Sequence, residues 1–211
     1  MQQIKNVIFD FGNVIFEIDF KKAQQSFADL GITNVDDFFA HKGHTNLFDD
    51  LETAKISPSE FRSGIRTTAN KPNLSDVQID DAWNSLLIGS FEDNNKALLE
   101  MREKYRTFLL SNSNEIHYDW IMDYIKSAFN LENYDDYFER AYFSQQMKLR
   151  KPNKEIFEQV IQENNLIPAA TLFIDDSPQH LEGAKKLGLQ TLLMTEKPSN
   201  LRSFLQANGL L

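Results

Sequence analysis

The sequence predicts a doubly wound α/β fold, in which helices cover both faces of a parallel sheet, with an all-helical segment inserted after the first strand. Three observations lead to this prediction. Short apolar runs without polar alternation, which are typical of strands buried on both faces, recur along the chain. Helical patterns separate most of these runs, whereas one long segment has helical patterns only. A chain of 211 residues is long enough for one such domain with a modest insertion.

The strands of the sheet are expected at four apolar runs and at a weaker fifth one. The four runs are residues 7–9, 108–110, 172–174 and 191–194, and the fifth is 141–143. Apolar residues at helical spacing predict helices over 95–104, 153–163 and 181–187. Gly188 is the expected end of the last of these helices.

The inserted segment, residues 15–90, interrupts this alternation because it reads as helices only. An apolar stripe begins at Phe20 and ends at Gly31, and a further helix is expected at 81–87. Residues 57–60, SPSE, have the pattern of a capping box with proline at the first helical position. We therefore expect residues 1–14 and 91–211 to form the core, with 15–90 as a separate helical unit.

Composition narrows the classes of partner. The net charge is −9 and no basic run is present, so nucleic acid and anionic membrane surfaces are poor partners. The absence of cysteine excludes disulfides, thiolate zinc sites and cysteine-nucleophile phosphatases. No apolar run approaches the ~20 residues that span a bilayer, and the N-terminus leads directly into a strand, so we expect a cytoplasmic protein. The oligomeric state stays open.

Polar side chains follow three of the predicted strands. Asp10 follows the first, Ser111 and Asn112 follow the second, and Asp175 and Asp176 follow the third. Ligands of open parallel sheets bind beyond the carboxyl ends of the strands, so these side chains are expected at one edge.

Three carboxylates at one edge repel each other, and a hard divalent cation such as Mg²⁺ resolves that repulsion. Mg²⁺ takes oxygen ligands and commonly binds substrate phosphate as well. A metal-held phosphoryl group beside an ionised aspartate is placed for in-line attack. Lys151, fixed before Pro152, is the expected charge partner. The pattern predicts a phosphatase that acts on a small phosphorylated metabolite.

Four segments of the chain resemble, in order, the four motifs of the haloacid dehalogenase-like hydrolase superfamily. They are FDFGNV at 9–14, LSN at 110–112, RKP at 150–152 and IDDS at 174–177, followed by Gly183 and Ala184. The helical insert between the first two resembles the helical cap of that family. The resemblance implies a Rossmann-like hydrolase core with an inserted all-helical cap domain.

The resemblance also implies a role for each matching residue. Asp10 would be the nucleophile and would form an aspartyl-phosphate intermediate. Ser111 and the amide of Asn112 would bind the phosphoryl group, and Lys151 would neutralise charge on Asp10 and on the phosphate. The implied Mg²⁺ ligands are Asp10, the carbonyl of Gly12, Asp175 and Asp176.

The chain departs from the family pattern at Gly12, where family phosphatases usually carry a second aspartate as general acid and base. A second departure is Lys148, near a position where the family often has glycine. Asp19, or a water held by Asn13, is a candidate source of the missing proton.

Three interpretations of Gly12 are open. The first is a metal-free 2-haloacid dehalogenase, which the Asp175-Asp176 pair argues against. The second is a catalytically weak phosphate-binding or signalling relative. The third, which we favour, is a branch similar to bacterial phosphatases that act on α-D-glucose 1-phosphate. A general acid contributes typically ~10²–10⁴-fold, and an anomeric leaving group depends on it less.

The four histidines have no metal-ligand spacing, and we expect surface or capping positions for them. They are His41, His44, His117 and His180. His44 and His180 are the two that could line a substrate pocket.

Overall fold

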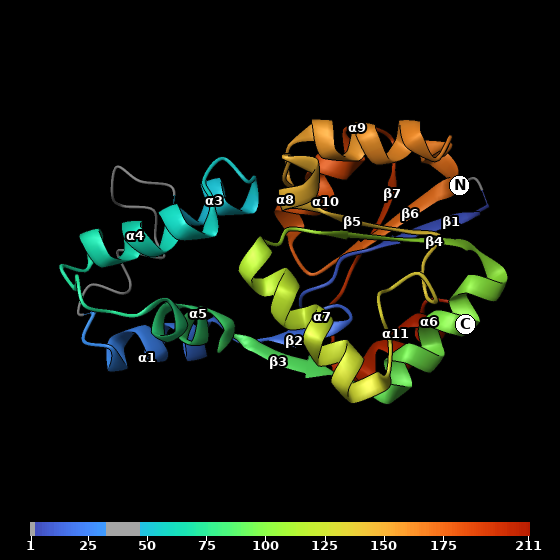
Figure 1. Ribbon diagram of the computed structural model, residues 1–211. Coiled ribbons are helices and arrows are strands. Elements are labelled where there is room, and N and C mark those ends of the chain that lie inside the picture. Colours follow the sequence, from blue (N-terminus) through green and yellow to red (C-terminus); the bar gives the residue numbers. More distant parts are fainter. Residues whose placement is uncertain (1–2, 33–46) are drawn as a thin grey trace.

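A five-stranded parallel sheet forms the centre of the protein (Figure 1), as seen in a computed structural model that describes residues 3–32 and 47–211. The strand order is β5-β4-β1-β6-β7, and every neighbouring pair is parallel. The strands are β1 (Asn6–Phe9), β4 (Arg106–Ser111), β5 (Arg140–Phe143), β6 (Thr171–Asp175) and β7 (Gln190–Leu193). The predicted doubly wound α/β fold is confirmed, and each predicted apolar run forms a strand.

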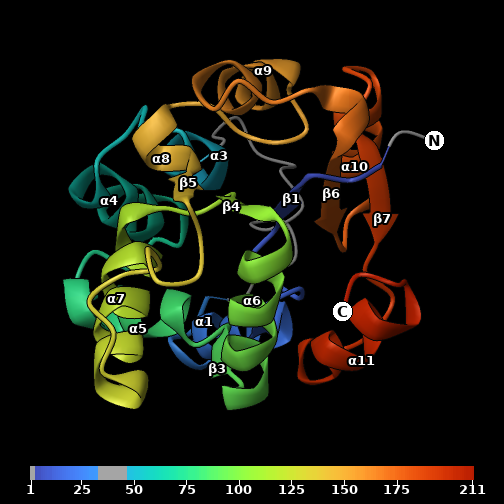
Figure 2. The same ribbon diagram turned by 90° about the vertical axis from the view of Figure 1, so that its right-hand side faces the viewer.

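Helices cover both faces of the sheet (Figure 2). On one face lie α6 (Glu92–Lys104), α7 (Glu115–Phe129) and α11 (Leu201–Ala207). On the other face lie α9 (Lys154–Glu163) and α10 (Pro178–Lys185). Short elements complete the core: α8 (Ser144–Met147) and the 3₁₀ turns η1 (Pro168–Ala170) and η2 (Pro198–Asn200).

Successive strand residues alternate between the two faces, and both faces are apolar. Val7 and Phe9 of β1 pack in the core on the α6–α7 side, whereas Ile8 packs on the α9–α10 side. The same alternation holds in β6, where Phe173 faces α9 and Ile174 faces the opposite way. Burial on both faces explains why these runs lack polar residues.

Helix α7 is long but is not among the helices expected from the sequence. Its N-cap is Asn114, whose side chain accepts a hydrogen bond from the backbone of His117. The helix packs on the sheet and also on α5 (Asp76–Asn84) of the insert. Because two partners cover it, its apolar residues extend beyond a single stripe, which obscures the helical period. No described helix combines the length and apolar character of a bilayer span.

The insert contains helices α1 (Phe20–Asp29), α3 (Leu47–Glu52), α4 (Pro58–Thr68) and α5 (Asp76–Asn84). Ser57 and Glu60 form the predicted capping box at the start of α4. The helix expected at 81–87 begins earlier, after an unpredicted capping box at Ser75, and ends at Asn84.

The expectation that residues 15–90 form helices only is wrong at both ends of the segment. Two short strands, β2 (Phe16–Ile18) and β3 (Leu87–Ser90), pair antiparallel there and connect the insert to the core (Figure 1). With three and four residues, they are too short to show a period of two in the sequence. The division into a core of 1–14 and 91–211 and a helical cap of 15–90 remains our proposal.

The helical insert lies over the carboxyl ends of the sheet strands and contacts the core there. Helix α3 is next to α8, and α5 is next to α7. Arg150, in the loop after α8, forms ion pairs with Asp49 and Glu52 of α3. These ion pairs therefore connect the insert to the loop that contains Lys151.

Gly183 permits a close approach between α10 and that same loop. A Cβ atom at this position would lie 2.4 Å from the carbonyl oxygen of Pro152 and 3.2 Å from the ring of Phe157. The backbone of Pro152 cannot yield as a flexible side chain could. The absence of a side chain at 183 therefore helps to fix the backbone next to Lys151.

We predict that Gly183→Ala lowers the free energy of unfolding by about 1–3 kcal/mol, since a methyl group in a closed space forces the backbone to shift. Urea unfolding measures this, with Glu182→Ala on the exposed side of α10 as the matched control. Equal unfolding midpoints for the two variants would contradict the argument.

Candidate active site

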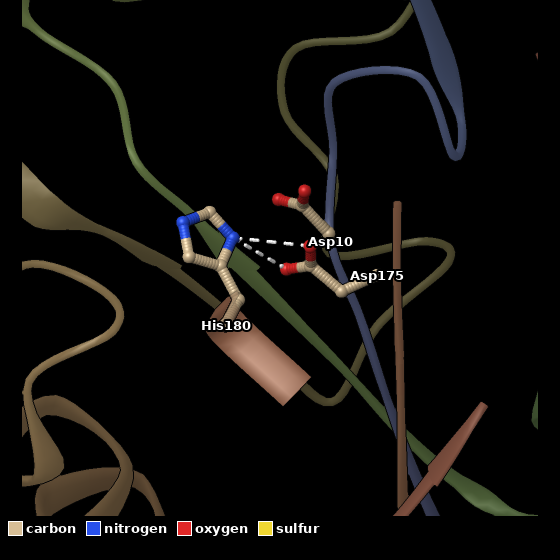
Figure 3. Close-up of side chains that lie close together, drawn as sticks. All are labelled: Asp10, Asp175 and His180. Atoms are coloured by element: carbon tan, nitrogen blue, oxygen red, sulfur yellow. Dashed lines mark hydrogen bonds and ion pairs between the residues drawn. The ribbon is translucent and has the colours of Figure 1, made fainter. Parts of the chain in front are cut away.

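Two aspartates from neighbouring strands meet at the carboxyl edge of the sheet (Figure 3). Asp10 directly follows β1, and Asp175 is the last residue of β6. The register pairs Phe9 with Ile174, and the backbone N–H of Asp10 donates to the carbonyl of Ile174 at 2.8 Å. A carboxylate oxygen from each aspartate and a ring nitrogen of His180 lie within 4.8 Å of one another. The sheet register thus brings residues 10 and 175 together.

Lys151 joins the two carboxylates. Its side chain is 0% exposed, and its Nζ donates to Asp10 Oδ1 at 2.6 Å and to Asp175 Oδ2 at 2.8 Å. Burial works against its charge, but attraction to the two aspartates outweighs burial and raises the pKa of Lys151 above its ordinary value. The lysine is therefore an ammonium group in the folded protein.

The two aspartates experience different environments. Burial works against ionisation of Asp175, but Lys151 and His180 outweigh it and lower its pKa to about 2. Burial raises the pKa of Asp10, Lys151 opposes the rise, and repulsion from Asp175 adds to it. The ionised form of Asp10 is therefore less well stabilised than that of Asp175, and a further cation would stabilise it.

Asp176 and Gly12 belong to the two loops that flank this pair. Asp176 is half-buried, and burial followed by repulsion from Asp175 raises its pKa above the ordinary value. Asn13, in a left-handed conformation with φ 54°, hydrogen-bonds through its side chain to Asp176. Its side-chain oxygen also accepts from the backbone of Ile18 at 3.3 Å. Both ends of the Asn13 side chain are thus engaged within the protein.

The donor set fits a hard divalent cation. Asp10 and Asp175 contact Lys151, and Asp176 is close enough for Asp175 to raise its pKa, so three carboxylates exceed the charge that Lys151 neutralises. The ligand atoms that lie within 4.8 Å of one another come from Asp10, Asp175 and His180, and Asp176 is not among them. Carboxylate and carbonyl oxygens are the ligands that Mg²⁺ takes in proteins. Gly12, whose carbonyl is an expected ligand, lies two positions after Asp10 on the adjoining turn.

Ser111 and Asn112 lie at the end of β4, beside β1. The Ser111 side chain is buried, and its hydroxyl donates to the carbonyl of Asn112 at 3.3 Å. The side chain of Asn112 holds the backbone of Lys151: its oxygen accepts from the Lys151 N–H at 2.9 Å and its nitrogen donates to the Lys151 carbonyl at 3.0 Å. This positioning role of Asn112 is not apparent from the sequence, because an asparagine carries no specific signal for it.

Lys148, three residues before Lys151, adopts a left-handed backbone with φ 57° at the end of α8. Glycine adopts that conformation without steric cost, which explains why the resemblance favours glycine near this position. The lysine takes the same conformation, so the loop keeps its path despite the departure.

The expectation of surface or capping positions is wrong for the two described histidines. His180 Nδ1 lies 3.0 Å from both carboxylate oxygens of Asp175 (Figure 3). His117 is buried and stacks on Trp83, with ring centroids 4.4 Å apart, and burial lowers its pKa to about 3. His41 and His44 lie outside the described residues.

A cavity of about 70 Å³ lies between the core loops and the inserted helices. That is the volume of about two water molecules. Core residues Gly12, Ser111, Asn112 and His117 line it, together with Glu52 and Trp83 of the insert. Asp19, by contrast, caps α1 by accepting from the Lys21 N–H at 3.0 Å, and it does not line this cavity.

Residues 4–188 of the chain match the sequence profile of the haloacid dehalogenase-like hydrolases. The chain is also similar to D-ribitol-5-phosphate phosphatase from Bacteroides thetaiotaomicron, with 34% identity over 194 residues, which cover 89% of this chain and 90% of that one.

Two solved structures are similar along nearly the whole chain. A HAD family enzyme from Bacteroides thetaiotaomicron, in complex with magnesium and inorganic phosphate, is 38% identical with a TM-score of 0.83, covering 94% of this chain and 98% of that one. A HAD-like family hydrolase from Porphyromonas gingivalis is 29% identical with a TM-score of 0.84, covering 98% of both chains.

We predict that Lys151→Met lowers the free energy of unfolding by about 3–5 kcal/mol, because it leaves two buried carboxylates without a cation. Without the lysine, their folded-state pKa values lie above the unfolded ones. The loss of unfolding free energy in Lys151→Met therefore grows as pH rises and shrinks as pH falls. Urea unfolding without divalent ions, at about pH 8 and about pH 5, measures it.

Lys154→Met is the matched control, since Lys154 lies on the same segment with a side chain that is 61% exposed. A Lys151→Met deficit no larger than that of the control, or one that does not change with pH, would contradict the proposed charge balance.

Proposed function

The chain belongs to the haloacid dehalogenase-like hydrolase family and is a phosphatase that uses Mg²⁺, and we propose that it hydrolyses a small sugar or polyol phosphate through an aspartyl-phosphate on Asp10. The observation that carries this proposal is the buried Lys151 ammonium between Asp10 and Asp175. The complex of a 38% identical relative with magnesium and inorganic phosphate supports it.

In the proposed reaction, a carboxylate oxygen of Asp10 attacks phosphorus. Lys151 donates hydrogen bonds to Asp10 and Asp175, and its charge stabilises the negative charge that develops on the phosphoryl oxygens. Ser111 and the amide of Asn112 donate hydrogen bonds to the same oxygens. Mg²⁺, when bound by Asp10, Asp175, Asp176 and the carbonyl of Gly12, supplies charge neutralisation of the phosphate. Water then hydrolyses the acyl phosphate and restores Asp10.

The helical insert is proposed to close over the bound substrate. The cavity of about 70 Å³ is too small for a whole sugar phosphate, so entry requires the insert to move away from the core. The ion pairs of Arg150 with Asp49 and Glu52 connect the two parts in the closed arrangement. Closure would exclude water from the Asp10–Lys151 pair and strengthen its electrostatics.

The substrate class has two candidates. The 34% identical relative is named for D-ribitol 5-phosphate, in which a primary alcohol leaves, and this favours a polyol phosphate. Gly12 at the position of the general acid favours α-D-glucose 1-phosphate, because an anomeric oxygen is a better leaving group. We place the polyol phosphate first, because the identity extends over 89% of the chain.

A metal-free 2-haloacid dehalogenase is the second candidate function, favoured by Gly12 alone. Against it stands the excess of carboxylates over lysine at the site, which has no use in a reaction without a metal. Release of halide from a 2-haloacid in the presence of EDTA is the result that this alternative requires.

We predict that the protein hydrolyses 4-nitrophenyl phosphate only with Mg²⁺ present and that Asp10→Asn lowers the rate at least about 10³-fold, because the amide is not a nucleophile. Asp19→Asn is the matched control, since asparagine retains the N-cap of α1. Activity of Asp10→Asn equal to that of the control would overturn the proposed function. In a panel of phosphate esters, we expect D-ribitol 5-phosphate to have a higher kcat/KM than α-D-glucose 1-phosphate.

A further inference from the structure

The site has no proton donor at the second position after the nucleophile, and the space there is filled. A Cβ atom on Gly12 would lie 2.9 Å from Cδ1 of Ile18, the residue that ends β2. Departure of an alkoxide from phosphorus without a proton is slow, and a positioned acid contributes typically ~10²–10⁴-fold. A polyol phosphatase therefore needs an acid from elsewhere in the cavity.

Glu52 is in the right place for this task. It is the last residue of α3, its side chain is 22% exposed, and it lines the same cavity as Gly12, Ser111 and Asn112. Its oxygen Oε2 is buried without a hydrogen-bond partner among the described residues. Arg150 Nη2 is 3.1 Å from that oxygen, an ion-pair distance without hydrogen-bond alignment.

His117, Asp19 and Asn13 do not supply this proton. Among the described residues that line it, Glu52 and His117 are the carboxyl and imidazole groups. Burial keeps His117 neutral, with a pKa of about 3, so it is not charged at neutral pH. Asp19 caps α1, and the side chain of Asn13 is engaged by Ile18 and Asp176.

We propose that Glu52 is a catalytic residue that serves as the general acid and base of the reaction. The helical insert places Glu52 in the cavity. Gly12 leaves the core without an acid at the usual position. This inference rests on the proposed phosphatase function. Because Glu52 belongs to the insert, the proton donor and the nucleophile meet only when the insert is closed. Hydrolysis of substrates with basic leaving groups would thus depend on closure.

The proposed reaction has two steps, in which Glu52 first gives a proton and then takes one. An oxygen of Asp10 bonds to phosphorus, and the ester P–O bond breaks with its electron pair on the leaving oxygen. That oxygen takes the proton of Glu52 and departs as the alcohol. Water then bonds to phosphorus and gives a proton to the Glu52 carboxylate, while the bond from phosphorus to Asp10 breaks. Inorganic phosphate, the Asp10 carboxylate and protonated Glu52 result.

The protonation behaviour of Glu52 agrees with both steps. Burial raises the pKa of Glu52 to about 7, with Arg150 opposing the rise and Asp49 adding to it. A group with a pKa near the working pH is present in both protonation states. Arg150 has a second partner in Asp49, so its charge is shared between two carboxylates of α3.

The test compares two leaving groups in the Glu52→Gln variant. With D-ribitol 5-phosphate, whose alkoxide needs a proton, we expect kcat to fall about 10²–10⁴-fold. With 4-nitrophenyl phosphate, whose phenolate leaves without one, we expect a fall of less than about tenfold. Asp49→Asn is the matched control, because it changes the other carboxylate bound to Arg150, and it should affect both substrates alike and weakly.

A second variant tests the same claim by gain of function. Gly12→Asp combined with Ile18→Val, which removes the obstructing Cδ1, should raise kcat for the polyol phosphate in the Glu52→Gln background. Equal losses on both substrates in Glu52→Gln, or equal behaviour of Glu52→Gln and Asp49→Asn, would overturn the role of Glu52. Failure of the wild-type protein to hydrolyse either ester with Mg²⁺ would instead overturn the proposed function.

Discussion

A buried lysine ammonium that contacts two carboxylates places strict demands on the surrounding structure. Lys151 must reach Asp10 and Asp175 together, at 2.6 and 2.8 Å, from a loop that belongs to neither strand. Removing any one of the three charges would leave the others buried and unbalanced. The register of β1 with β6 supplies the carboxylates, and Asn112 holds the backbone of Lys151. The resulting excess of negative charge is what makes the site suitable for Mg²⁺.

The core and the insert contribute different parts of the proposed chemistry. The core carries the proposed nucleophile and the candidate metal ligands at the ends of strands buried on both faces, and it carries Lys151 on the loop before α9. The insert carries Glu52, which reaches the cavity through a helix that Arg150 ties to the core. Placing the acid on a separate element makes proton transfer conditional on closure, and it leaves room for Ile18 beside Gly12.

Much of this arrangement could be predicted from the sequence, and the remainder shows where such reasoning ends. The apolar runs before Asp10, Ser111 and Asp175 locate strand ends, because continuous burial leaves a local signal. The strands β2 and β3 are too short for a period, and α7 is apolar on more than one side. The contact of His180 with Asp175 is local, but the IDDS motif before it implies no role for a histidine at that position. The contact of Glu52 with the cavity depends on how distant elements pack, and no motif near Glu52 marks it.

The central claim is that the carboxylate of Asp10 accepts the phosphoryl group. The most direct measurement is borohydride reduction of enzyme quenched during turnover with Mg²⁺ and a phosphate ester, followed by peptide mapping, since an acyl phosphate of aspartate is reduced to homoserine. We predict homoserine at position 10, and none in enzyme quenched without substrate. Reduction at another aspartate, or steady turnover with no homoserine at position 10, would contradict it.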